Sequence, residues 1–506
     1  MCIYGVVIMR FIQQLFIKEE NKNRKKDACV GRIDPGARAI LRALEEDGFE
    51  AYVVGGCVRD LLLGEIPHDW DITTVATPDE VSEVMTRRNW RVIDGKGRRF
   101  GTLIVVMNHG MYEVTTFRSE MYGEDSHRPE EVRFAHSLRE DVSRRDFTVN
   151  ALAVDKDGVI YDYFHGVEDL ENKKLRAVGD AVERFREDAL RMFRACRFLG
   201  QLDFMADNEI VAAFPNAFDR VKGLSLERIR EEVGKLLLSN HSARGMDLLV
   251  RTGLNECQCM IRRNGHISYV DILPELSHLV DLPQEKEYHE FDGWYHALRT
   301  MEAVPPILVL RWAALLHDVG KGMPGVRAIR VGRYTDYGHD QVGADMAQAL
   351  LSRWEMPKSF VRRVTWLIRN HMRYHYYAHV PEANVIKWLR QMARSGEFIS
   401  LEDMKEAIEQ LGEVCRADAI GTGKEPVQID HQNDLRAYML ELCKEMPVTT
   451  KELHYDERTI DALGNQVGEG MKNLLHRVQN GSLENQADVL CDAAMRYRRR
   501  HEETNQ

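Results

Sequence analysis

The sequence predicts an α+β protein: a small α/β head followed by mostly α-helical domains. Residues 52–54 form a short, apolar, β-rich run that ends at two glycines, which is typical of a buried strand. Residues 180–199, and again the chain after Pro426, have helical spacing instead. With 506 residues, 44% of them hydrophobic and 29% charged, the chain is long enough for several globular domains.

The head is expected to alternate between short helices and strands. The sequence predicts helices over residues 35–48, 58–63 and 78–88, and strands over 52–54, 70–73, 102–107 and 111–117. A tight hairpin is expected at residues 108–110, where Gly110 permits a sharp turn. These lengths are typical of a compact α/β unit.

Two features of the head point to phosphoryl chemistry. Gly55 and Gly56 free the backbone to turn tightly and leave N–H groups open to an anion at the start of the next helix. Asp69 and Asp71 stand two apart on a predicted strand, so their carboxylates are expected on one side. A phosphate cradle beside two carboxylates suits Mg²⁺-dependent phosphoryl transfer.

Composition sets further limits. The net charge of −11 argues against bulk affinity for nucleic acid, but residues 173–201 hold eight basic and four acidic residues, a local positive stripe. Nine cysteines without a C-x-x-C pair indicate reduced thiols in a cytoplasm. Residues 1–17 are too short and too polar to span a bilayer, so we expect a leading extension over residues 1–34 and no membrane association.

Several motifs occur in the order of one family. G-G-x-V-R-D, L-L-G and D-x-D-I-T-T, between Gly55 and Thr74, resemble the nucleotidyltransferase head of class II tRNA CCA-adding enzymes and bacterial poly(A) polymerases. The resemblance implies that Asp69 and Asp71 hold Mg²⁺ and that Glu113 adds a third carboxylate. It also implies nucleotide contacts at Gly55, Gly56 and Arg59. Residues 119–132 resemble the mobile loop of CCA-adding enzymes.

Two later motifs extend the resemblance over about residues 35–238. R-R-D-F-T-V-N-A, from Arg144 to Ala151, implies nucleotide contacts at Arg145 and Asp146. Glu187 to Arg191 matches E-D-x-x-R, and four charged residues recur every three positions on one predicted helix face: Asp188, Arg191, Arg194 and Arg197. A carboxylate that accepts from an exocyclic amine, beside a guanidinium that donates to a ring nitrogen, suits cytosine and adenine alike.

The middle of the chain resembles the HD superfamily of metal-dependent phosphohydrolases. The pattern H…HD…D transfers to His296, His317, Asp318 and Asp418, which implies a divalent transition metal. His339 and His371 match the additional histidines of binuclear or phosphate-binding versions. Lys321 is expected to face a phosphate.

Together these resemblances imply an enzyme that adds CCA to tRNA from CTP and ATP, with an HD phosphohydrolase side activity. Two alternative functions within the same class stay open: poly(A) polymerase, and addition of A only or of CC only. An alternative from another class is an HD phosphohydrolase whose head only binds RNA. Oligomeric state is also open. We expect these domains: the extension, the head at 35–178, a helical neck and body at 179–275, the HD domain at 276–425, and an RNA-binding tail at 426–506.

Overall fold

The computed structural model describes residues 32–94, 97–108, 110–122, 129–380, 382–427 and 429–504. The expected extension up to residue 31, residue 109 of the expected hairpin turn and residues 123–128 of the expected mobile loop lie outside this set. The chain forms two compact units, residues 1–236 with 248–272 and residues 237–247 with 273–506. Each unit is described by itself.

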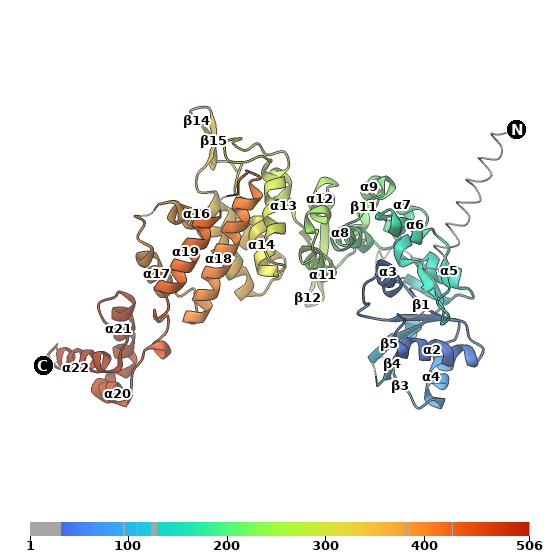
Figure 1. Cartoon of the computed structure of the whole chain (residues 1–506), viewed down its shortest axis with the longest axis horizontal. Helices are drawn as coiled ribbons and strands as arrows, with labels where there is room; N and C mark the ends of the chain where they lie inside the picture. Colours follow the sequence, from blue (N-terminus) through green and yellow to red (C-terminus); the bar gives the residue numbers. More distant parts are fainter. Residues whose placement is uncertain are drawn as a thin grey trace. The chain divides into compact units, whose positions relative to one another are not determined.

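The first unit is built on a seven-stranded mixed sheet with the order β3-β4-β5-β2-β1-β8-β9. Its strands are β1 (Ala51–Val54), β2 (Asp71–Thr74), β3 (Arg91–Ile93), β4 (Thr102–Met107), β5 (Gly110–Thr116), β8 (Leu152–Val154) and β9 (Ile160–Asp162). Strands β1, β3, β4 and β5 of this sheet are labelled in Figure 1. Only β2 and β5 pair in parallel, with Asp71 opposite Glu113. Residues directly opposite each other on paired strands share a face, so both carboxylates lie on one side of the sheet.

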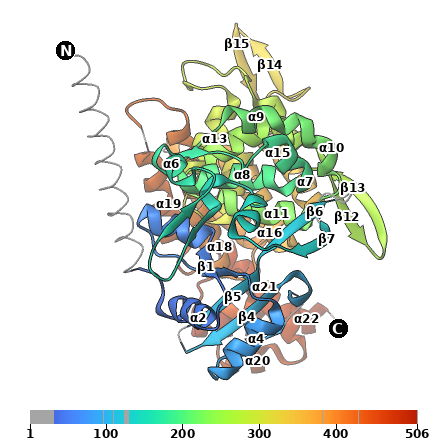
Figure 2. The ribbon, with the colours of Figure 1, turned by 90° about the vertical axis from the view of Figure 1, so that its right-hand side faces the viewer.

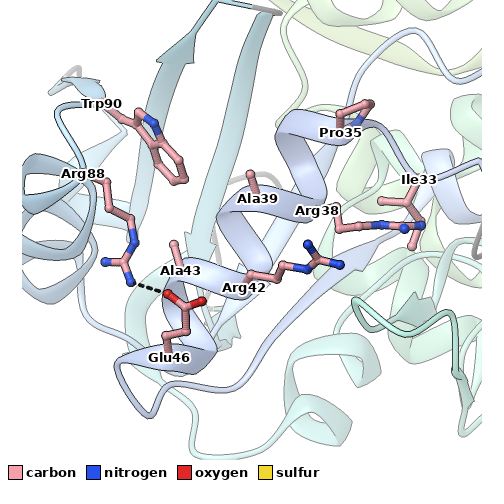
Figure 3. Close-up of a pocket in the computed structure, with 9 residues that line it drawn as sticks. All are labelled: Ile33, Pro35, Arg38, Ala39, Arg42, Ala43, Glu46, Arg88 and Trp90. Atoms are coloured by element: carbon pink, nitrogen blue, oxygen red, sulfur yellow. Dashed lines mark hydrogen bonds and ion pairs between the residues drawn. The ribbon is translucent and has the colours of Figure 1, made fainter.

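Two helices, α2 (Pro35–Glu46) and α4 (Pro78–Arg87), pack on the opposite face. The Tyr112 side chain points to the opposite face of the sheet from its neighbour Glu113. Its hydroxyl donates to Asp34. The Asp34 carboxylate also caps α2 by accepting the N–H groups of Gly36 and Ala37. Arg88 at the end of α4 binds Glu46 at the end of α2 at 3.0 Å (Figure 3). The helices thus cover one face and leave the carboxylates to the other.

The neck differs from its prediction. The expected helix over residues 180–199 is two helices, α7 (Ala181–Glu187) and α8 (Leu190–Leu202), with Asp188 in an extended conformation between them. The Asp188 carboxylate accepts the N–H of Leu190 at 3.0 Å. Aspartate competes with the helix for backbone donors in this way, so the helix ends there. The prediction that Asp188 shares one helix face with Arg191 was wrong.

Short helices and strands complete the first unit up to residue 272. They are α3 (Gly56–Leu63), η1 (Arg98–Phe100), β6 (Arg118–Tyr122), β7 (Pro129–Phe134), α5 (Leu138–Ser143), η2 (Thr148–Asn150), α6 (Gly166–Glu171), β10 (Lys174–Leu175), β11 (Met205–Ala206), α9 (Asn208–Ala213), η3 (Phe214–Ala217), α10 (Phe218–Val221), α11 (Leu226–Leu237), η4 (Leu254–Glu256), β12 (Gln258–Arg263) and β13 (His266–Asp271). Helix α12 (Ser242–Arg251) contributes to both units.

Among its described residues, the regular structure of the second unit is helical except for one hairpin. Its elements are η5 (Pro274–Leu279), α13 (Gly293–Ala303), α14 (Leu308–Leu316), β14 (Arg327–Arg330), β15 (Arg333–Asp336), α15 (His339–Arg353), α16 (Lys358–His379), α17 (Val385–Arg394), α18 (Leu401–Gly421), α19 (Asp430–Leu442), η6 (Thr450–Glu452), α20 (Glu457–Leu463), η7 (Gly464–Gln466), α21 (Val467–Gln479) and α22 (Ala487–Thr504). Four tryptophans are fully buried in its core: Trp294, Trp312, Trp354 and Trp388. The hairpin β14–β15 projects from these helices in both views (Figures 1 and 2).

The predicted fold class is confirmed: a mixed-sheet α/β head is followed by helices. In the part of the chain that the structure describes, no helix is long and apolar enough to cross a membrane.

Candidate active sites

The carboxylate face of the head opens into a cavity of about 570 Å³. Strand residues Asp71 and Glu113 line one side of it, and residues of the neck line the other. The cavity gathers ten of the residues predicted from sequence: Gly56, Arg59, Asp71, Glu113, Arg145, Asp146, Asp188, Arg191, Arg194 and Arg197. Residues that are more than a hundred positions apart in the sequence therefore surround one space.

The three predicted carboxylates influence one another. Burial raises the pKa of Asp71, against the nearby charge of Arg145, and Asp69 raises it further. Burial also raises the pKa of Glu113, and Asp71 and Asp69 add to the effect. Asp69 itself is exposed in the bend before β2, so the prediction that it lies on the strand was wrong. Close carboxylates that resist ionisation are suited to a cation, and their oxygen atoms are the ligands that Mg²⁺ prefers.

The two glycines let an arginine approach the backbone. Gly55 has a φ of +89°, and a Cβ atom there would lie 2.6 Å from Nη1 of Arg145 and 3.8 Å from Oδ2 of Asp71. The N–H of Gly55 donates to the carbonyl of Leu152 at 3.0 Å, so the prediction that it is open to an anion was wrong. Arg145 Nε is buried, and its N–H donates to no acceptor among the described residues. The Gly55 position therefore makes room for a guanidinium beside the carboxylates.

A hydrogen-bonded chain links the head to the neck behind this arginine. Arg59 donates to the Asn150 side chain at 2.7 Å, Asn150 donates to Asp146 at 3.1 Å, and Arg194 of α8 donates to Asp146 at 2.6 and 2.8 Å. Burial raises the pKa of Asp146, but the charge of Arg194 and the bond from Asn150 outweigh it and bring the pKa to about 2. Asn150 was missed as a site residue, although its motif was recognised.

The remaining neck residues have partners within the protein. Arg191 is buried and donates to Glu187 at 2.6 Å, to the carbonyl of Arg144 at 2.8 Å and to that of Arg184 at 3.1 Å. Arg197 is buried in an ion pair with Glu232 at 2.5 Å. Asp188 lies 3.3 Å from Arg228, a cavity residue that the sequence reasoning missed.

Three guanidinium groups lie close to the ring of Phe198 in α8. Its ring centroid lies 4.1 Å from the guanidinium carbon of Arg197, 5.3 Å from that of Arg59 and 5.4 Å from that of Arg194. Cation–π contacts of this kind strengthen when the ring is desolvated, and Phe198 is buried. No sequence signal distinguished it from an ordinary core residue.

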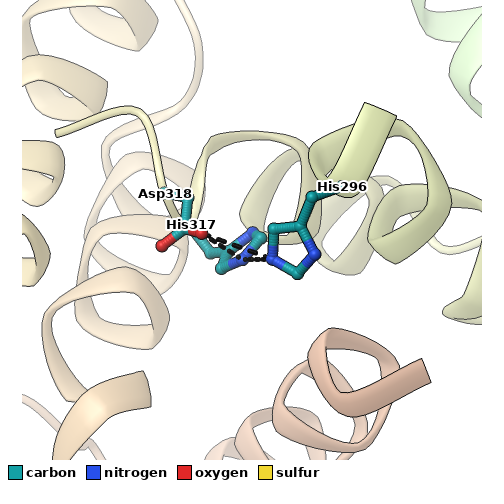
Figure 4. A group of neighbouring side chains, drawn as sticks. All are labelled: His296, His317 and Asp318. Carbon is teal, nitrogen blue, oxygen red and sulfur yellow. Dashed lines mark hydrogen bonds and ion pairs between the residues drawn. The ribbon is translucent and has the colours of Figure 1, made fainter. Parts of the chain in front are cut away.

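The second unit brings the four predicted HD ligands together. His296 Nε2 lies 3.0 Å from His317 Nε2 and 3.3 Å from Asp318 Oδ2 (Figure 4). The same His296 atom lies 3.1 Å from Asp418 Oδ1. Helix α14 ends at Leu316, so His317 and Asp318 follow it and turn towards one point. His296, His317 and Asp318 are buried and offer ligand atoms within 4.8 Å of one another.

A second group shares Asp318. His339 Nε2 lies 3.1 Å from Asp318 Oδ1 and 3.2 Å from His371 Nε2, and these three residues again offer ligand atoms within 4.8 Å. In His317, His339 and His371 the Nδ1 atom lies 2.6–2.7 Å from a backbone carbonyl three residues earlier. A proton on Nδ1 leaves Nε2 as the free ligand atom, the usual arrangement of metal-binding histidine. Each group therefore offers a donor set that would suit a metal ion, and Asp318 belongs to both groups.

The surroundings of this centre include residues that the sequence reasoning missed. His375, one helical turn after His371, lies 2.8 Å from Asp418 Oδ2. The ring of His289 lies 4.7 Å from that of His296, and burial lowers the pKa of His289 to about 3. Burial likewise lowers the pKa of His371 to about 3. Lys321, predicted to face a phosphate, contacts Asp318 Oδ2 at 2.5 Å.

Sequence comparisons define the classes of domain. Residues 51–176 match the model of the poly A polymerase head domain, residues 203–256 that of a probable RNA- and SrmB-binding site of polymerase A, and residues 293–422 that of the HD domain. The resemblance stated from the motifs is thereby confirmed for the head and for the HD domain.

Curated proteins that match this chain are CCA-adding enzymes. A CCA-adding enzyme of Lactobacillus helveticus is 48% identical over 220 residues, 44% of this chain and 54% of that protein. One of Enterococcus faecalis is 42% identical over 258 residues, 51% of this chain and 60% of that protein. The chain thus spans a little over half the length of the curated relatives that it matches.

Solved structures extend the likeness. A Bacillus stearothermophilus CCA-adding enzyme in complex with CTP superposes with a TM-score of 0.61 at 27% identity, over 93% of this chain and all of that one. A Thermotoga maritima CCA-adding enzyme shares the fold, with a TM-score of 0.55 at 16% identity over 93% and 97% of the two chains.

Proposed function

We propose that this chain is a template-independent nucleotidyltransferase that adds CCA to the 3′ end of tRNA from CTP and ATP in the cytoplasm. The observation that carries the proposal is the head cavity, where Asp71 and Glu113 face Arg145 and the arginine-lined neck. The names of its relatives, and the CTP complex of one of them, support the same activity.

In this proposal Asp69, Asp71 and Glu113 hold Mg²⁺, which supplies positive charge for the phosphates when bound. The tRNA 3′ oxygen forms a bond to the α-phosphorus, and the bond from that phosphorus to the bridging oxygen of pyrophosphate breaks. Arg145 contributes fixed positive charge beside the carboxylates, where the triphosphate lies. The chain from Arg59 through Asn150 and Asp146 to Arg194 keeps the nucleotide-facing wall in place before substrate binds.

We place base selection at Asp188, a cavity residue that is an acceptor beside guanidinium donors. The donor is Arg191, as the sequence predicted, or Arg228, which already lies 3.3 Å from Asp188. The ratio of CTP to UTP incorporation decides between them. Loss of that ratio in Arg228→Ala but not in Arg191→Ala assigns Arg228, and the reverse result assigns Arg191.

For the second unit we propose a metal-dependent phosphohydrolase centre. His296, His317, Asp318 and Asp418 hold one divalent transition metal, and Asp318, His339 and His371 hold a second. The metal supplies an activated water and neutralises the phosphate when bound. Elemental analysis of the purified protein, with hydrolysis of p-nitrophenyl phosphate and of its bis ester, tests this assignment.

One assay distinguishes the proposed addition from its rivals. A tRNA that ends at its discriminator base and a second tRNA that ends in CC are each incubated with CTP, with ATP, and with both, and the product length is measured. Addition of two residues with CTP and three with both supports CCA addition. Long A tracts indicate a poly(A) polymerase, a stop after two residues a CC-adding enzyme, and addition of A only to tRNA ending in CC an A-adding enzyme. No extension of any substrate leaves an RNA-binding head on an HD phosphohydrolase.

A further inference from the structure

The hairpin of β14 and β15 exposes side chains that a solvated loop seldom carries. Its strands pair only with each other among the described strands. Ile329 is 69% exposed, Tyr337 70%, and Val331 at the turn is fully exposed. Exposed apolar and aromatic side chains on a projecting element are available to a partner.

The two faces of the hairpin differ in charge. Arg327 pairs with Asp336, and Ile329 with Tyr334, so these four side chains share one face, where Arg327 and Asp336 form an ion pair at 2.8 Å. The other face holds Arg330 opposite Arg333, with Ala328 and Thr335. Tyr337 follows the end of β15, and its ring lies against the guanidinium of Arg330. This second face, defined by Arg330, Arg333 and Tyr337, is called the basic face below.

The basic face brings like charges together. Side chains directly opposite on paired strands have Cβ atoms about 4.5–5.5 Å apart, and like charges in that arrangement destabilise the pair. Glu287 pairs with Arg333 at 2.6 Å, but both side chains are more than half exposed, so the compensation is small. The Arg330 guanidinium lies 4.9 Å from the centroid of Tyr337. An anion that contacts both arginines would relieve their repulsion, and the tyrosine beside it offers an aromatic ring.

The base of the hairpin is fixed to the HD centre. The carbonyl of Asp336 lies 2.7 Å from Nδ1 of His339, and the Asp336 carboxylate accepts the N–H of Gly322 at 2.9 Å. Along β15 the three steps from Arg333 to Asp336 span roughly 10 Å. One phosphate cannot occupy both ends of that distance, whereas a chain of nucleotides can.

We propose that the basic face binds single-stranded nucleic acid, with a phosphate against Arg330 and Arg333 and a base against Tyr337. Guanidinium groups beside an aromatic platform are the general means of holding a single strand without reading its sequence. If the HD centre is the phosphohydrolase proposed above, the hairpin gives it a preference for the ends of polynucleotides over free phosphoesters; the binding itself does not depend on that activity.

Binding is tested by hydrogen exchange of the full chain with an unstructured twelve-residue oligouridylate. We expect protection of the peptide that covers residues 327–338, and loss of that protection in Arg330→Ala/Arg333→Ala and in Tyr337→Ala. Tyr337→Phe keeps the ring and is expected to keep the protection. Arg362→Ala removes an exposed arginine of α16 in the same unit and is the control for loss of a positive charge away from the hairpin. Protection that is absent, or unchanged in the variants, overturns the proposal, as does protection that follows protein concentration instead of RNA.

Delivery is tested by kinetics on a 3′-phosphorylated oligonucleotide and on p-nitrophenyl phosphate. Loss of one base–aromatic stack is expected to raise KM for the oligonucleotide by roughly five-fold or more in Tyr337→Ala. KM for p-nitrophenyl phosphate should not change. An equal change for both substrates overturns the delivery role. If neither substrate is hydrolysed by the wild type, the phosphohydrolase proposal fails, and hydrogen exchange still decides the binding.

Discussion

Replacing Arg197 with methionine tests whether the neck arginines bind nucleotide or hold the neck together. Sequence reasoning assigned Arg197 to the nucleotide. In the structure Arg197 Nε contacts Glu232 of α11 at 2.5 Å and its Nη1 donates to Gln201 at 2.6 Å. The Arg197 and Glu232 side chains are only 11% and 8% exposed. We therefore expect Arg197→Met to act first on stability.

The magnitude follows from the burial of the pair. Removing one partner of a buried ion pair costs about 3–5 kcal/mol, because the other charge stays buried without compensation. In a unit of this size each kcal/mol lowers Tm by roughly 2–4 °C, so the expected shift is roughly 6–20 °C. Arg197→Met/Glu232→Leu replaces the pair with apolar groups and is expected to recover most of the loss. Calorimetry, following the transition of the first unit, measures both variants.

A separate readout detects nucleotide binding. KM for CTP and for ATP is measured below the transition temperature, where the variant stays folded. If Arg197→Met unfolds within about 1 kcal/mol of the wild type and instead raises both KM values strongly, Arg197 is a nucleotide ligand. The structural reasoning about the pair is then refuted.

Three further predictions concern the two sites. Asp71→Asn is expected to abolish nucleotide addition while tRNA still binds in gel-shift titration; ordinary incorporation by this variant would exclude Asp71 as a metal ligand. Arg145→Ala is expected to raise KM for CTP and ATP alike, by ten-fold or more, because a lost charged contact to phosphate costs about 1.5–3 kcal/mol; a change for one nucleotide only would contradict a phosphate contact. His317→Ala/Asp318→Ala should remove the transition metal found by elemental analysis and the phosphoester hydrolysis while addition continues; retained metal would place it elsewhere.

The head could be predicted well because its chemistry depends on local sequence. Strand β1 ends at the two glycines, the short helix α3 follows, and β2 begins with Asp71. Asp71 therefore belongs to the same strand–helix–strand segment as the glycines. Glu113 is 42 residues further on, and only the parallel pairing of β2 with β5 brings it opposite Asp71. The spacing of these residues in the sequence does not predict that pairing. Glu113 was predicted from the family motif instead.

The neck was predicted less well because periodicity does not show where a helix ends. Charged residues every three positions between Asp188 and Arg197 suggested one continuous face. One hydrogen bond, from the N–H of Leu190 to the Asp188 carboxylate, separates Asp188 from the helix that carries the three arginines. The burial of Arg191 and Arg197 depends on Glu187 and Glu232, and the second of these is 35 residues away on another helix.

At the HD centre the motif predicted the distant residues, whereas nearby histidines were overlooked. Its candidate ligands were predicted from a motif that spans more than a hundred residues, yet His375 and His289 were not distinguished from the other histidines of the chain. His375 stands one turn after His371 on α16, so helical geometry brings both towards the same centre. That proximity could have been inferred once α16 was recognised as one continuous helix.

The arginine-lined cavity also explains why the net charge of −11 is a poor guide to this site. Its arginines are mostly matched within the protein: Arg144 with Asp141, Arg191 with Glu187, Arg194 with Asp146, Arg197 with Glu232 and Arg228 with Asp188. The acids that make the composition negative thus hold guanidinium groups in place. Arg145 lies outside these pairs: the N–H of its buried Nε donates to no described residue, and its charge lowers the pKa of Asp71. The positive charge of Arg145 therefore lies beside the carboxylates, where the proposed phosphoryl transfer would require it.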